Sequence, residues 1–308
     1  MSVRAMDMKS QIPETVQIVE VGPRDGLQNE ESALEVGVKI SLVDKLSEAG
    51  FSQIEAGSFV SPKWVPQMAD SDRIFAGIQR KQGVEYIALT PNLMGFEAAV
   101  ASQVSRVAVF AAASETFSKK NINCGIAESL QRFEPLLEQA KALKIPVRGY
   151  VSCVVNCPFE QAIAPDKVAE VAKRLIDLGC YEVSLGDTTG KGSPKSIADM
   201  LSIVQQQVPV ERLAIHCHDT YGQALANIYA ALLQGVAIID SSVAGLGGCP
   251  YAPGASGNVA TEDVLFLLRS LGIETGIDLE KAIAAGNFIS EQLGRNNQSR
   301  VAQAMASG

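Results

Sequence analysis

The feature that most constrains the fold is a regular alternation of short apolar runs with longer segments of helical pattern. Seven helical segments separate or follow these runs: Val36–Ala49, Ala69–Arg80, Glu128–Leu143, Pro165–Leu178, Pro194–Gln206, Ala224–Leu233 and Thr261–Leu271. The candidate strands are Gln17–Val21, Gln53–Ala56, Glu85–Leu89, Arg106–Phe110, Val147–Val151, Glu182–Leu185, Leu213–Ile215 and Ala237–Val243. Strands that alternate with helices at spacings of roughly 20–40 residues are typical of parallel βα units.

Eight strands are the number that closes a (β/α)8 barrel, which usually takes ~250 residues. We therefore predict an α/β fold, a TIM barrel, with one domain over residues 1–308. Residues 273–308 would be an appended helical tail, with a helix near Leu279 to Leu293. An open, doubly wound sheet is the alternative, but no Gly-x-Gly-x-x-Gly follows the first strand. Because barrel enzymes place their sites at the C-terminal ends of the strands, chemistry is expected there.

Composition excludes several classes of partner. The net charge of −8 and the absence of a Lys/Arg-rich run argue against nucleic acid. No apolar run is long enough to span a membrane. The six cysteines show no paired spacing and predict reduced thiols. Since the first residues resemble neither a secretory signal nor a transit peptide, a cytoplasmic location is expected.

The two histidines of the chain, His216 and His218, lie at the end of the run Leu213–Ile215. In a strand they would point to the same side from Cα positions ~6.6 Å apart, so both imidazoles could bind one metal ion. Cys217 would face the other way. A pair of core or surface histidines is the alternative.

Three more strand ends carry charged side chains. Arg24 and Asp25 follow the first strand in a turn shaped by Gly and Pro, where they could form a local ion pair or serve as an electrophile beside a metal ligand. Glu55 ends the second strand and could be a loop hydrogen-bonding residue. Asp187 follows the sixth and could be a turn or helix-capping residue.

The segment after the eighth strand is rich in glycine. Residues 245 to 258 hold five glycines and two prolines, which disfavour both helix and strand. Such a loop can bring backbone amides close to a ligand. It carries the thiol of Cys249 and the amide of Asn258; the alternatives are a free loop thiol and a helix N-cap.

Three segments, Val21–Glu30, Ser58–Asp70 and Gly245–Asp263, together resemble the 3-hydroxy-3-methylglutaryl-CoA lyases, and the similarity runs from about residue 15 to 290. The resemblance implies cleavage of 3-hydroxy-3-methylglutaryl-CoA to acetyl-CoA and acetoacetate, a reaction of leucine degradation and ketone-body formation. It also implies a divalent cation, Mg²⁺ or Mn²⁺, held by a set of four ligands: Asp25, His216, His218 and Asn258. A mixed oxygen and nitrogen set suits such an ion better than a closed zinc site.

The implied reaction is a retro-Claisen cleavage, and we assign roles to residues as a hypothesis. Arg24 would stabilise the oxyanion of the thioester enolate. Asp187 would be the base that removes the hydroxyl proton, with Glu55 as its competitor. Cys249 would protonate the enolate.

Further residues are predicted to bind the substrate or its CoA portion. Lys119 and Lys120 are placed in a loop near the rim, although they could be ordinary solvated lysines. The remaining candidates are Gln28, Gly247 and Gly248.

Two other functions stay open. One is a synthase that condenses an acyl-CoA with a 2-oxo acid on the same barrel, and the other is a catalytically silent barrel that binds metal and CoA. The partner in each case is an acyl-CoA, and the chain is expected to form a homodimer.

Overall fold

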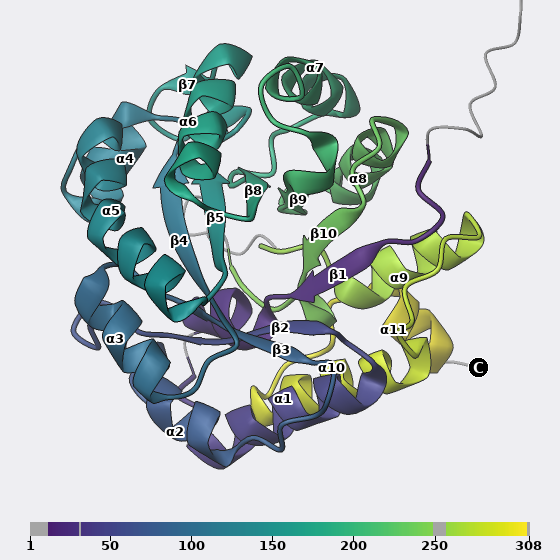
Figure 1. The fold of residues 1–308 in the computed structure, drawn as a ribbon. Helices are drawn as coiled ribbons and strands as arrows, with labels where there is room; N and C mark the ends of the chain where they lie inside the picture. Colours follow the sequence, from purple (N-terminus) through teal and green to yellow (C-terminus); the bar gives the residue numbers. More distant parts are fainter. Residues whose placement is uncertain (1–11, 31, 249–256, 307–308) are drawn as a thin grey trace, which may run out of the picture.

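The structure is a computed structural model, which describes residues 12–30, 32–248 and 257–306. Eight parallel strands close a barrel in the order β1-β10-β9-β8-β5-β4-β3-β2, so the predicted (β/α)8 fold is confirmed (Figure 1). The barrel strands are β1 (Gln17–Glu20), β2 (Gln53–Ser58), β3 (Glu85–Leu89), β4 (Arg106–Ala112), β5 (Val147–Ser152), β8 (Glu182–Asp187), β9 (Leu213–Cys217) and β10 (Ile238–Ser241). A small hairpin of β6 (Asn156–Cys157) and β7 (Gln161–Ala162) follows β5.

Helices surround the barrel (Figure 1). They are α1 (Val36–Ala49), α2 (Ser71–Gly77), α3 (Leu93–Ala101), α4 (Glu115–Ile122), α5 (Ile126–Leu143), α6 (Pro165–Leu178), α7 (Pro194–Val204), α8 (Ala224–Leu233), α9 (Thr261–Ser270), α10 (Leu279–Gln292) and α11 (Arg300–Ala306). The sequence pattern missed α3 and α4. Both begin at capping residues that give a physical reason for their start, because the side chains of Asn92 and Ser114 accept backbone N–H bonds from the first turn.

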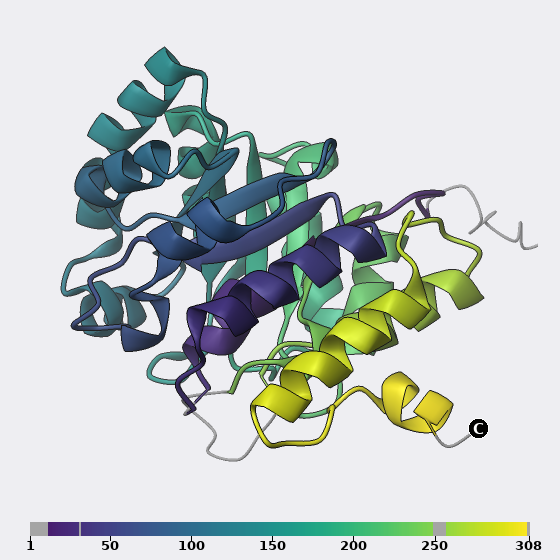
Figure 2. The ribbon, with the colours of Figure 1, turned by 90° about the horizontal axis from the view of Figure 1, so that it is seen from below.

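The C-terminal segment joins the helical layer. Helix α10 packs against α1 and α9, and Figure 2 shows α10 alongside α1. Asn297, beyond α10, donates a hydrogen bond of 3.2 Å to Glu262 at the start of α9. The residues expected as an appended tail therefore complete the ring of helices between the last and first βα units.

The barrel interior has an apolar part and a polar part. The apolar part is a separate cluster of buried side chains: Val19, Val21, Ile87, Leu89, Ala108 and Tyr150. Strands β2, β5, β8 and β10 contribute buried charged side chains instead, among them Glu55, Arg148, Glu182 and Asp240. Barrel interiors are usually filled by branched apolar residues, so this polar part is a departure that calls for a function.

Candidate functional site

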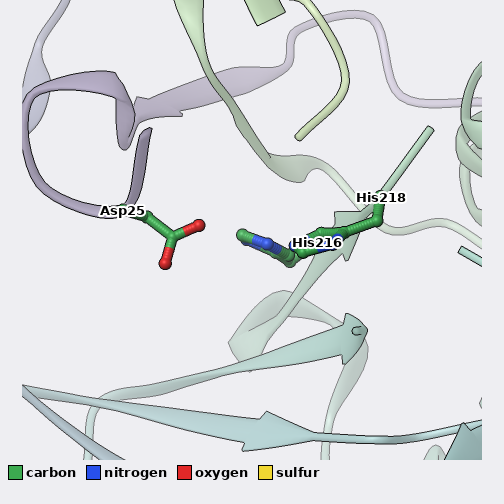
Figure 3. Close-up of side chains that lie close together, drawn as sticks. All are labelled: Asp25, His216 and His218. Atoms are coloured by element: carbon green, nitrogen blue, oxygen red, sulfur yellow. The ribbon is translucent and has the colours of Figure 1, made fainter. Parts of the chain in front are cut away.

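Asp25, His216 and His218 meet at the C-terminal end of the barrel. Their potential ligand atoms all lie within 4.8 Å of one another. Figure 3 shows the carboxylate of Asp25 directed toward the two imidazoles. The histidines come from β9 and from the residue just after it, two positions apart, so the strand alternation expected from the sequence brings both rings to the same side. Both are 92% buried, at 8% exposure.

The two imidazoles have opposite electrostatic surroundings. Burial alone would lower the pKa of His216, but its Nδ1 lies 3.3 Å from the carboxylate of Asp240, and the net effect raises that pKa. Burial and the neighbouring His216 lower the pKa of His218 to about 4. His218 is therefore neutral at pH 7, the form in which an imidazole binds a metal. Its Nδ1 is buried and has no hydrogen-bond partner among the described residues.

Asn258 lies beside this group, held by the chain that returns from the glycine-rich loop. Its backbone forms an isolated antiparallel bridge with His218. Its side-chain amide donates 2.8 Å to Asp25 Oδ2 and 3.2 Å to the carbonyl of Leu246. The reading of Asn258 as a helix N-cap is wrong, since α9 begins after Ala260.

Arg24 and Asp25 occupy a π-helical turn, Gly22–Gly26, which follows β1. Arg24 Nη1 lies 2.6 Å from Asp25 Oδ1, so the local ion pair does form. Although burial opposes ionisation of Asp25, Arg24 and the imidazoles lower its pKa to about 2. The carboxylate is thus charged at neutral pH, and its second oxygen faces Asn258.

Glu55 holds the guanidinium of Arg24 from the neighbouring strand. It accepts 2.9 Å and 3.2 Å bonds from Nε and Nη2 of Arg24, and a 2.5 Å bond from the hydroxyl of Tyr150. The ring of Tyr150 also lies under Arg24, 5.7 Å from its guanidinium carbon. Burial works against the charge on Arg24, yet Glu55 and Asp25 raise its pKa above the usual value. Both oxygens of Glu55 are therefore already engaged.

Asp187 has the contrasting environment. It ends β8, is fully buried, and accepts a 2.8 Å bond at Oδ2 from the backbone of Gly192. Its Oδ1 has no partner among the described residues. Burial raises the pKa of Asp187 to about 6, although backbone amides of the following loop and His216 oppose the rise. The turn-residue reading holds in part, since Oδ2 does close a loop, but one oxygen is left over.

A buried layer beneath this site escaped the sequence reasoning. Arg148 on β5 contacts Asp240 on β10 at 2.8 Å and 3.1 Å and Glu182 on β8 at 2.5 Å. Its Nη1 also donates 2.8 Å to the hydroxyl of Tyr150. Asp240 accepts a further bond of 2.7 Å from Ser184. Every guanidinium nitrogen of Arg148 is used.

A signal for this layer was present in the sequence. Arg148 and Tyr150 stand at alternate positions in an apolar strand, as do Glu182 and Ser184. Polar residues with a period of two inside a buried strand point to a polar barrel interior, because successive side chains face opposite sides.

The predicted CoA-binding residues are dispersed around the rim. The prediction that Lys119 and Lys120 lie in a loop is wrong, because both belong to the last turn of α4. Lys120 Nζ lies 4.0 Å from the ring centroid of Phe159 in the β6–β7 turn. Gln28 is half-buried in the turn after β1.

The glycine-rich loop is described only in part. Gly247 has a left-handed backbone (φ 111°), and a Cβ there would lie 3.0 Å from the amide of Asn258. Gly248 is half-buried beside it. Cys249 lies outside the described residues.

The side chains present fit a divalent cation. Asp25 offers a carboxylate oxygen, His218 a buried nitrogen without a partner, and His216 its Nε2 because Nδ1 faces Asp240. The donors combine oxygen and nitrogen and come from one side, which leaves room for substrate oxygens. Among the described residues, none of the helices is both long enough and apolar enough to cross a membrane.

Comparison with known proteins gives consistent matches along the chain. The HMGL-like family matches residues 15–289. The chain is 60% identical over 305 residues to the mitochondrial hydroxymethylglutaryl-CoA lyase of Pongo abelii, covering 98% of this chain and 94% of that protein. It is 60% identical to the 3-hydroxy-3-isohexenylglutaryl-CoA/hydroxymethylglutaryl-CoA lyase of Pseudomonas aeruginosa, over 96% and 98% of the two chains. The crystal structure of a P. aeruginosa hydroxymethylglutaryl-CoA lyase matches with a TM-score of 0.95 at 59% identity, covering 96% and 99%.

Proposed function

Because this chain belongs to the HMGL-like family, we propose that it is a carbon–carbon lyase that cleaves 3-hydroxy-3-methylglutaryl-CoA to acetyl-CoA and acetoacetate. The resemblance inferred from the sequence is confirmed by relatives of about 60% identity that carry this name. The observation that carries the proposal is the meeting of Asp25, His216 and His218 within 4.8 Å, beside the buried pair of Arg24 and Glu55.

We assign the metal site to Asp25, His216 and His218, with Asn258 next to them as the fourth candidate. A divalent ion held there, Mg²⁺ or Mn²⁺, would acidify a coordinated substrate hydroxyl and fix its position. The protein contributes the arrangement of the ligands: Asp25 is kept ionised by Arg24, and His218 is kept neutral by burial. These states are the ones that metal binding requires.

Asp187 is our choice for the general base over Glu55. Glu55 is occupied by Arg24 and Tyr150, whereas Asp187 keeps one buried oxygen without a partner. Burial raises the pKa of Asp187 to about 6, which suits a base that must accept a proton near neutral pH. Glu55 then orients Arg24.

Arg24 supplies positive charge where the thioester oxygen becomes an enolate. Its guanidinium is fixed by Glu55 and Asp25, so little reorganisation is needed when charge develops. Cys249 remains the proposed proton donor to the enolate carbon. Because that residue lies outside the described residues, its role depends on chemistry alone: a thiol of ordinary pKa near ~8.5 can donate to a carbanion.

A coupled assay tests the proposal. The full chain is incubated with 3-hydroxy-3-methylglutaryl-CoA, with Mg²⁺ or Mn²⁺ or with chelator, and acetoacetate is measured through its NADH-dependent reduction. We expect acetoacetate only with metal present. If none forms with metal present, the lyase is excluded. A parallel sample with acetyl-CoA and a 2-oxo acid, followed by free-thiol release, tests the synthase alternative.

Further arms concern substrate range and assembly. The relative from P. aeruginosa is also named for a 3-hydroxy-3-isohexenylglutaryl substrate, so that thioester is the informative second substrate. The assignment of Gln28, Lys119, Lys120, Gly247 and Gly248 to CoA is tested by the KM of their alanine variants. A homodimer and a cytoplasmic location stay predictions, to be checked by light scattering and by fractionation.

A further inference from the structure

We propose that Asp240 is a positioning residue: it holds the imidazole of His216, and Arg148 in turn holds Asp240. The same guanidinium reaches across the barrel interior and, through Tyr150, also fixes the group that orients Arg24. The inference rests on the proposed function only in taking His216 as a metal ligand.

The contact between Asp240 and His216 fixes which imidazole nitrogen is available. Nδ1 of His216 lies 3.3 Å from Asp240 Oδ2. A buried carboxylate accepts but does not donate, so the neutral ring carries its proton on Nδ1 and presents Nε2. Ligating imidazoles depend on such an outer hydrogen bond for tautomer and ring orientation.

The carboxylate of Asp240 cannot rotate away from His216, because its other hydrogen bonds are all to buried groups. Its exposed fraction is 1%, and it receives two bonds from Arg148 and one from Ser184. Burial opposes its charge, but Arg148 lowers its pKa below the usual value. The carboxylate is therefore both charged and fixed on three sides.

From Arg148 the bonds continue to the opposite side of the site. Its Nη1 donates 2.8 Å to the hydroxyl of Tyr150, which donates 2.5 Å to Glu55. Glu55 binds Arg24 at 2.9 Å, and Arg24 binds Asp25 at 2.6 Å. Since Asp25 and His216 belong to the same group of potential metal ligands, an ion bound to both would close these bonds into a ring.

Glu182 marks the boundary of this ring. It binds Nε of Arg148 at 2.5 Å, and among the described residues no hydrogen bond joins it to His216, Glu55 or Tyr150. If the buried layer served stability alone, Glu182 and Asp240 would be equivalent partners of one guanidinium. If Asp240 positions His216, only Asp240 should alter the metal site. Glu182→Gln is thus a matched control for Asp240→Asn.

The first measurement reads the tautomer directly. The chain has two histidines, so ¹⁵N-histidine labelling of the full protein gives only two imidazoles to assign. In metal-free protein at alkaline pH, we expect the ring of His216 to carry its proton on Nδ1. Its signals are assigned by their absence from a His216→Gln sample. Asp240→Asn should give mixed tautomers at His216, whereas Glu182→Gln should not. An Nε2–H tautomer at His216 in the parent protein would overturn the proposal.

The second measurement is the dissociation constant for Mn²⁺ alone, from titration calorimetry of the full chain. Asp240→Asn should weaken it ~10–100-fold, the usual cost of losing an outer-shell partner. Glu182→Gln should change it far less than this, because Glu182 binds Arg148 and has no hydrogen bond to a proposed ligand among the described residues. Equal changes in the two variants would assign the layer to stability and overturn the proposal.

Tyr150→Phe provides the variant that keeps the carboxylate and breaks only the bridge to Glu55. We expect unchanged Mn²⁺ affinity with a lower kcat, because the Arg24 side of the ring loosens while the His216 side stays held. A changed Mn²⁺ affinity with unchanged kcat would contradict this role of Tyr150.

Binding of Mn²⁺ to the parent protein separates the proposed function from the positioning role. If the parent does not bind Mn²⁺, the proposed function is wrong. If the parent binds Mn²⁺ and Asp240→Asn binds it equally well, the positioning role is excluded.

Discussion

The rim site and the buried layer beneath it contain the same residue types, but they differ in whether their buried polar atoms have hydrogen-bond partners. At the rim, His218 Nδ1 and Asp187 Oδ1 are buried without a hydrogen-bond partner among the described residues. In the layer, Arg148 uses all its guanidinium nitrogens and Asp240 is bonded on both oxygens. Buried polar atoms without partners cost free energy unless a ligand completes them. Together with the grouping of Asp25, His216 and His218, this difference supports a ligand site at the rim and a supporting role for the layer.

The largest expected effect comes from breaking the layer. Arg148→Met leaves Asp240 and Glu182 buried without their cation, which should cost ~3–5 kcal/mol in the free energy of unfolding. Urea denaturation followed by circular dichroism measures this cost. Arg148→Lys keeps the charge but loses the planar guanidinium, so its free energy of unfolding should fall between those of Arg148→Met and the parent. A cost below about 1 kcal/mol would mean that the layer is not the support we infer.

At the rim, the free energy of unfolding should depend on whether the metal ion is bound. With free Mn²⁺ at 100 times its dissociation constant, the parent protein should gain ~2.7 kcal/mol in unfolding free energy, because the ion binds only the folded chain. Chelator should reverse the gain, and Asp25→Ala should abolish it. The same gain in Asp25→Ala would place the ion elsewhere. Thermal unfolding with and without metal gives the comparison.

The rim was largely predictable from sequence, because local pattern determined it. His216 and His218 alternate on one strand, and Asp25 follows another, so the strand count alone brought them to one end of the barrel. The Gly-rich segment before Asn258 was recognisable in the same way. The orientation of the Asn258 side chain could not be derived from the sequence. It faces Asp25, and not the helix that follows, because the chain returns alongside the end of β9 at this point.

The layer was not predicted, because its contacts join strands far apart in the sequence. Arg148 and Asp240 are separated by 92 positions and come from strands that are not neighbours, because β8 and β9 lie between β5 and β10 in the barrel. A polar residue within an apolar run shows that something buried needs a partner, but not which strand supplies it. The choice between Asp187 and Glu55 had the same obstacle, since it depends on the neighbours Tyr150 and Arg24.

A smaller effect, of opposite sign to that of Arg148, is expected at Asp187. Its pKa is raised from 3.8 to about 6 in the folded chain, mainly by burial. The contribution of Asp187 to the free energy of unfolding is therefore lost as pH rises from about 4 through 6, where the folded chain must ionise a buried acid. Asp187→Asn should be more stable than the parent above pH 6, by ~1–3 kcal/mol, with the difference vanishing toward pH 4.

This stability gain should accompany a loss of activity. As the proposed base, Asp187 should contribute ~10²–10⁴-fold to kcat. In the parent, kcat/KM should fall as pH drops below the pKa of Asp187, because the base must be ionised. Stability is measured as a function of pH on protein freed of metal with chelator, and kcat and KM are measured on metal-loaded protein. An Asp187→Asn variant that is less stable at pH 8 and fully active would make Asp187 a structural residue.

The smallest effect should come from Ser184, which lies within the buried layer beside Asp240. Its hydroxyl donates 2.7 Å to Asp240 Oδ2, an oxygen that also receives Arg148 Nη1 and faces His216. Removing one donor among several leaves no buried charge unpaired, so Ser184→Ala should cost only ~1 kcal/mol. Chemical denaturation measures it, with Ser184→Thr as the variant that keeps the hydroxyl. Because Arg148 still holds Asp240, Mn²⁺ affinity should be unchanged. A loss of affinity equal to that of Asp240→Asn would show that the orientation of the carboxylate, and not its charge, controls His216.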